Sequence, residues 1–111
     1  MSGTDSPDSP EAPDSPEARR RFVELLEAQH DFPGTYSLMV IARADEAVEA
    51  AVLAAAAVGL AGPLAEDAHE RRPSAQGKYV SHRLHVPVAS ADDVLALYAR
   101  LRAVDGVITI L

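Results

Sequence analysis

The chain has 111 residues, and its 10 Lys and Arg against 17 Asp and Glu give a formal net charge of −7. This length fits a single domain. Because the chain has no Cys, it forms no disulfide, thiolate nucleophile, iron–sulfur cluster or Cys-ligated zinc site. The acidic balance argues against binding nucleic acid or an anionic membrane through bulk positive charge.

No segment has the composition of a targeting or membrane-spanning sequence. The first residues lack the apolar core and the basic start of a secretory signal. The longest uncharged apolar run, residues 50–65, is mostly Ala, contains Gly59, Gly62 and Pro63, and is shorter than the roughly 20 residues that span a bilayer. We therefore expect a cytoplasmic protein without a membrane partner.

Residues 1–15 differ in composition from the rest of the chain. They repeat Ser-Pro or Ala-Pro before an acidic residue, and they contain neither Lys nor Arg. Such a segment buries too little apolar surface to offset the entropy cost of ordering it, so we expect an acidic, disordered, solubilising tail. A docking tail or a set of Ser-Pro phosphorylation sites is the functional alternative.

Residues 16–31 are predicted to contain an amphipathic helix. Ser15 is a good N-cap and Pro16 suits the first helical position. The apolar side chains recur at helical spacing: Phe22, Leu25 and Leu26. The cations Arg19–Arg21 then form a solvated helix face rather than an anion patch. Residues 31–34, which contain Pro33 and Gly34, end the helix near Gln29.

The remaining residues, 32–111, alternate between strand and helix patterns. Strands are predicted at residues 35–43, 64–73, 78–89 and 107–111, and helices between residues 45–59 and 90–104. The order βαββαβ with right-handed crossovers predicts an α+β fold. We expect a ferredoxin-like plait: a four-stranded antiparallel sheet with two helices on one face, plus the N-terminal helix.

The first predicted strand has apolar residues on both faces. One face carries Tyr36, Leu38 and Val40, and the other carries Met39 and Ile41. The second set is expected to pack under the N-terminal helix, through Phe22 and Leu26, or against a second subunit.

The strand at residues 78–89 alternates, with two exceptions. His82 falls on the apolar face. Pro87 cannot donate a backbone hydrogen bond, so we expect weakened pairing or a bulge at that end.

Both later helices have start signals and an apolar stripe. Asp45 precedes the first helix, and Ser90 with Asp93 resembles a capping box before the second. The expected stripes are Val48, Ala51, Val52, Ala55 and Val58, ended by Gly59, and Val94, Leu97, Tyr98 and Leu101.

Motifs for catalysis and cofactor binding are absent from the sequence. It contains neither a P-loop nor a Gly-x-Gly-x-x-Gly fingerprint. His82 and His85 point to opposite faces of a strand, and either one paired with His69 makes an incomplete metal site. Tyr79 is one aromatic where an RNA-binding sheet needs several. We expect no catalytic residue, no metal, no cofactor and no nucleic-acid partner.

The stretch around the predicted hairpin is the most informative part of the chain. A turn with free amides beside cations and hydroxyls can hold a small anion. The tentative ligand-binding residues are Arg72, Ser74, Gln76, Gly77, Lys78, Tyr79 and Ser81. The alternative is an ordinary turn made by Ser74 and Gly77, in which Lys78 discourages edge pairing.

At this hairpin the sequence resembles the YbeD-like family, small bacterial proteins with a domain of unknown function. The resemblance covers residues 31–111. It rests on Phe32-Pro33, the Ser74-x-x-Gly77-x-Tyr79-x-Ser81 pattern, the Leu97-Tyr98-x-x-Leu101 helix and the apolar C-terminal strand. The family implies a ferredoxin-like fold similar to ACT-type regulatory domains, and no established activity.

Three residues depart from the family pattern. Ala75 stands where Ser is common, Met39 where Lys is common, and Ala42 where Gly is common. The first two changes remove polar groups from a shared site.

We therefore expect a non-catalytic, ACT-like regulatory or protein-interaction domain, as a homodimer or with a protein partner. The alternative is a sensor that binds a small anionic metabolite at the hairpin.

Overall fold

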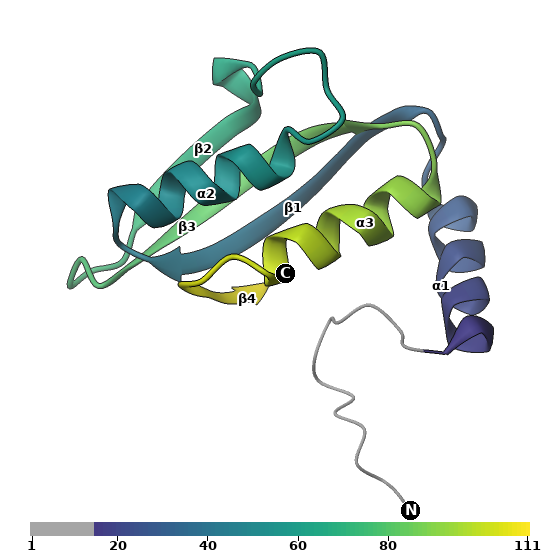
Figure 1. Ribbon diagram of the computed structural model, residues 1–111, viewed down its shortest axis with the longest axis horizontal. Helices are drawn as coiled ribbons and strands as arrows, with labels where there is room; N and C mark the ends of the chain where they lie inside the picture. Colours follow the sequence, from purple (N-terminus) through teal and green to yellow (C-terminus); the bar gives the residue numbers. More distant parts are fainter. Residues whose placement is uncertain (1–14) are drawn as a thin grey trace, which may run out of the picture.

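The computed structural model describes residues 15–111, so the predicted disordered tail lies outside the described residues except for Ser15. The elements follow in the order α1 (Pro16–Gln29), β1 (Gly34–Arg43), α2 (Glu46–Ala56), η1 (Glu66–Ala68), β2 (His69–Pro73), β3 (Tyr79–Val88), α3 (Ala91–Arg102) and β4 (Val107–Ile110) (Figure 1). The predicted α+β class is confirmed.

A single antiparallel sheet of four strands has the order β2-β3-β1-β4. The two central strands pair in continuous register from Gly34 opposite Val88 to Arg43 opposite Tyr79. β2 and β4 are the edges, and each is joined to the centre by a helical crossover. This arrangement is compatible with the predicted ferredoxin-like plait.

Side chains alternate along β1 and β3, so that one row is buried and the other row lies on the opposite, more exposed face of the sheet. The buried row and the helices α2 and α3 share one apolar core. From β1 and β3 this core takes Leu38, Val40, Ala42, Leu84, Val86 and Val88, and from the helices it takes Val48, Val52, Ala56, Val94, Leu97 and Leu101. The other face of the sheet carries the alternate residues, and its central side chains Met39 and Ile41 are half-buried.

The predicted helix starts are confirmed by their caps. The hydroxyl of Ser15 accepts from the amide of Ala18 at 3.0 Å, and one carboxylate oxygen of Asp45 accepts from Ala47 at 2.7 Å. At α3 the amide of Asp93 donates to the Ser90 hydroxyl at 3.3 Å. The Asp93 carboxylate accepts from the amide of Ala89 at 2.9 Å, one residue before the N-cap.

The expectation that the N-terminal helix covers Met39 and Ile41 is wrong. Phe22 packs against Tyr98 of α3, with ring centroids 6.5 Å apart, and Leu26 enters the core on the helix side. Arg19 and Asp92 also join α1 to α3, at 3.1 Å. α1 therefore lies beside the start of α3 and does not cover Met39 and Ile41 (Figure 1).

Two predicted boundaries also need correction. Residues 64–68 are not strand, because residues 66–68 form a 3-10 turn in which the amide of Ala68 donates to the carbonyl of Ala65 at 2.9 Å. α2 ends at Ala56, ahead of the predicted Gly59. Val58 thus leaves the expected apolar stripe and is 55% exposed.

No bulge forms at Pro87, because its missing N–H is not needed there. The amide of Met39 donates to the carbonyl of Leu111, the residue after β4, so the backbone groups of the odd-numbered residues of β1 point away from β3. Pro87 lies opposite Thr35, in a pair that exchanges no backbone hydrogen bond, and β2 ends its pairing earlier, at Leu84. The register irregularity lies instead between β1 and β4, at Ile41 and Ala42.

Gly106, in the turn before β4, provides a test of the packing under α2. Its φ is +100°, and an added Cβ would lie 2.7 Å from Cγ2 of Val48. Gly106→Ala should lower the free energy of unfolding by roughly 1–3 kcal/mol. Gly62 has open space around it, so Gly62→Ala should change stability little. Urea unfolding compares the two, and equal values would contradict this account.

Candidate functional site

The tip of the β2–β3 hairpin uses its own polar groups to form the turn. The amide of Ser74 donates to the carbonyl of Tyr79 at 2.8 Å, and the amide of Gly77 donates to the carbonyl of Ser74 at 3.0 Å. The Ser74 hydroxyl accepts from the amide of Tyr79 at 3.2 Å. Three amides that the sequence offered to an anion are therefore already bonded, and Gln76 and Lys78 are left as exposed side chains.

Two of the predicted site residues meet on the open face of the sheet. Arg72 lies opposite Ser81 in the β2–β3 register, and the next pair on this face is Glu70 opposite Arg83. They belong to a cavity of about 390 Å³ lined by Met39, Glu70, Arg71, Arg72, Ser81 and Arg83. We call it the open-face cavity. Ser74, Gln76, Gly77, Lys78 and Tyr79 lie outside its lining.

The open-face cavity combines positive charge with one carboxylate. Arg72 and Arg83 are both exposed, and Oε2 of Glu70 lies 3.9 Å from Nε2 of His85. Arg83 and Glu70 were not among the predicted site residues. The signal was present in the sequence, since strand alternation places Ser81 and Arg83 on the same face two residues apart.

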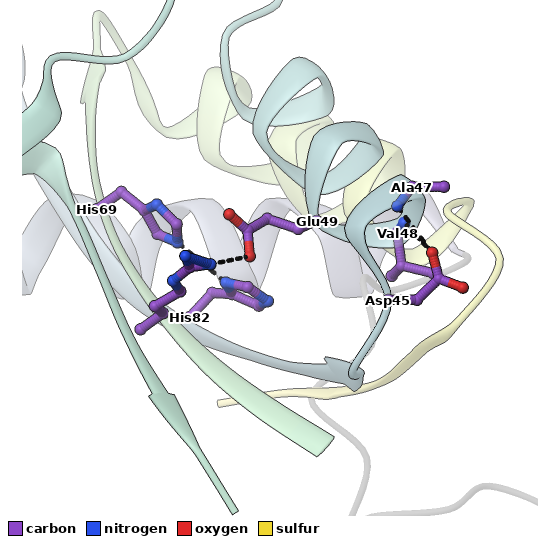
Figure 2. A network of polar contacts seen from close by, with 7 residues as sticks. Asp45, Ala47, Val48, Glu49, His69 and His82 are labelled. Carbon is purple, nitrogen blue, oxygen red and sulfur yellow. Dashed lines mark hydrogen bonds and ion pairs between the residues drawn. The ribbon is translucent and has the colours of Figure 1, made fainter. Parts of the chain in front are cut away.

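A second polar cluster lies on the helix side of the sheet, and His82 is its buried member (Figure 2). His82 is 1% exposed, and its Nδ1 lies 2.9 Å from Nε2 of His69, with the two rings stacked at a centroid distance of 5.1 Å. Beside them, Arg71 of β2 donates to Oε1 of Glu49 on α2 at 2.8 Å. His69 therefore faces His82 and not His85.

The surroundings of His82 favour its neutral form. Burial lowers the pKa of His82 below its usual 6.5, and the neighbouring charges of His69 and Arg71 act in the same direction, while Glu49 opposes them. A neutral imidazole donates at one nitrogen and accepts at the other, so the pair can share one hydrogen bond.

Within residues 15–111 no group of three or more potential metal ligands forms.

The buried histidine should make stability depend on pH. Because its folded pKa is lowered, the unfolded chain takes up the proton first as the pH falls. The stability contributed by neutral His82 is complete above pH 6.5 and is lost as the pH falls from there toward the folded pKa. One proton corresponds to at most about 1.4 kcal/mol per pH unit.

Urea unfolding at a series of pH values checks this expectation. His82→Leu should flatten the dependence below neutral pH, because the titrating group is gone and an apolar side chain fills its place. His85→Leu, on the open face, is the matched control and should keep the wild-type slope. An unchanged slope in His82→Leu would show that other groups cause it.

Comparison with known protein families assigns the chain to one of them. The model of a protein family of unknown function, DUF493, matches residues 27–111. The chain belongs to this family. The match confirms the YbeD-like resemblance, and it takes in the whole sheet, α2 and α3 while leaving out most of α1.

Other comparisons with this DUF493 domain add no relative. Neither the curated proteins nor the solved structures give a match. Among the helices of residues 15–111, none is long and apolar enough to cross a membrane.

Proposed function

We propose that this DUF493 domain is a non-catalytic, ACT-like regulatory or protein-interaction domain that forms a homodimer through the open face of its sheet. One observation carries the proposal: α2 and α3 complete the core on one side of the sheet, while none of the helices in residues 15–111 covers the row on the other side. We also propose a cytoplasmic location, which the lack of Cys fits.

The centre of the open face is apolar. Met39 and Ile41 lie side by side along β1, and the backbone of Met39 exchanges two hydrogen bonds with Leu111, so these side chains share the face. Leu111 is 64% exposed, and Ile108 on the same edge is 58% exposed. Contiguous exposed apolar side chains on a folded domain are typical of interaction surfaces.

The charges beside this apolar strip suit a second copy of the chain. Arg72 and Arg83 lie on the face together with Glu70, so the surface presents both signs within one short stretch. A two-fold axis can bring the Glu70 of each copy to an Arg of the other, because an isologous interface pairs the same patch with itself. Complementary charges of this kind fix the orientation of partners.

Sedimentation of the full chain at micromolar concentration tests the dimer. Ile41→Lys places an unpaired charge in the middle of the interface, so the dissociation constant should rise at least tenfold, equivalent to about 1.4 kcal/mol. Leu25→Lys is the matched control, because Leu25 is 55% exposed on α1, away from the open face. A wild-type monomer at these concentrations, or equal effects of the two variants, would contradict the homodimer.

The open-face cavity favours a second candidate function, the binding of a small anionic metabolite. Its lining includes Arg72, Arg83 and the hydroxyl of Ser81, which are groups that bind carboxylate and phosphate. The sequence predicted an anion site at the turn, whereas the open-face cavity would place the anion on the strands. At the turn, the amides of Ser74, Gly77 and Tyr79 are unavailable, since they bond within the hairpin.

Calorimetric titration with citrate and with inorganic phosphate separates the two positions for an anion. If the strands hold it, Arg72→Gln combined with Arg83→Gln should weaken binding at least tenfold, because each charge-assisted hydrogen bond contributes about 1.5–3 kcal/mol. Lys78→Gln, at the hairpin tip, should leave binding unchanged. If Lys78→Gln weakens binding and the double Arg variant does not, the anion binds at the turn. If neither anion gives a heat of binding, the proposed anion sensor is rejected.

A further inference from the structure

We propose a separate binding site for a small carboxylic acid with an apolar body, in the cavity between the end of α2 and α3. It goes beyond the proposed function, because it lies at the opposite end of β3 from the hairpin. The cavity has a volume of about 720 Å³. This is within the range of roughly 300–1,000 Å³ that is usual for small-molecule sites.

The cavity follows from the lengths of the elements. β1 and β3 each have 10 residues, whereas α2 has 11. At about 3.3 Å per strand residue and 1.5 Å per helix residue, α2 is about half as long as the strands. In Figure 1, β1 and β3 extend beyond the end of α2, and the chain that leaves this helix curves away from α3.

Most of the wall is apolar. The lining includes Val86 and Val88 of β3, Leu97 of α3, and Val58 and Leu60 from the turn after α2. Val58 is 55% exposed at this position, so a large apolar side chain is left in contact with water. An apolar ligand body would cover it and the wall beneath.

Arg100 supplies the charge that selects the ligand. Its half-buried side chain lines the cavity, and its Nε donates to the carbonyl of Ala55 in α2 at 2.9 Å. That bond fixes the plane of the guanidinium and leaves its two terminal nitrogens without a hydrogen bond or ion pair to residues 15–111. Two parallel N–H groups of a guanidinium match the two oxygens of a carboxylate.

Asp93 gives the site a direction. It lines the same cavity seven positions earlier on α3, which is about 10 Å along the helix axis. Its carboxylate is held by the amide of Ala89, and it repels a second carboxylate at that end. The acid group of the ligand therefore belongs at Arg100, with the apolar body over Val88 and Leu97.

Isothermal titration calorimetry of the full chain with phenylacetate tests the site. Phenylacetamide keeps the apolar body without the charge, and inorganic phosphate keeps a negative charge without the body. Phenylacetate should bind at least about tenfold more tightly than either, since only it uses both features of the cavity. No binding of phenylacetate, or equal binding of one of the other two probes, overturns the proposal.

Variants and methyl NMR locate the binding. Arg100→Met should weaken phenylacetate binding at least about tenfold, whereas Arg102→Met, on the same helix but outside the cavity lining, should not. If Arg100→Met fails to fold, the wild-type chain decides alone, through the methyl resonances of Val58, Val88 and Leu97. Shifts confined to these groups support the site, and shifts at Met39 of the open face instead overturn it.

Discussion

The pairing of β1 with β3 is the constraint on which the other features depend. Its register runs without interruption over the full length of both strands. A slip of one residue would turn Leu38 and Val40 toward solvent and bring Met39 and Ile41 under the helices. The same register decides that His82 enters the core while Ser81 and Arg83 join Arg72 on the open face.

The two helical crossovers then create two different kinds of surface. Both helices contribute to one core, so the opposite side of the sheet keeps a row of half-buried apolar side chains and exposed charged ones. On the covered side, α2 is too short to reach the ends of its strands, which leaves the cavity beside Arg100. The open face and the cavity beside Arg100 can therefore exist together, because the lining of the cavity does not include Met39, Ile41 or Leu111.

The polar cluster around His82 shows how the edge strand is held. His82 is the buried polar residue of the core, and a buried imidazole needs a partner. β2 provides it through His69, and the next inward residue of β2, Arg71, bonds to Glu49 on α2. The short strand is therefore attached both to its neighbouring strand and to its crossover helix, and protonation of His82 should weaken part of that attachment.

The sequence by itself determined the order of the elements, the helix caps and the alternation of the strands, because spacing, Ser15, Asp45 and Ser90 act over a few residues. It also placed His82 on the apolar face and Arg72 near Ser81. Only the tertiary structure decided that α1 packs on α3, that His69 faces His82 and that Arg83 and Glu70 complete the open-face cavity. Those contacts join residues far apart in the chain, and they depend on relative lengths of strands and helices that local patterns do not encode.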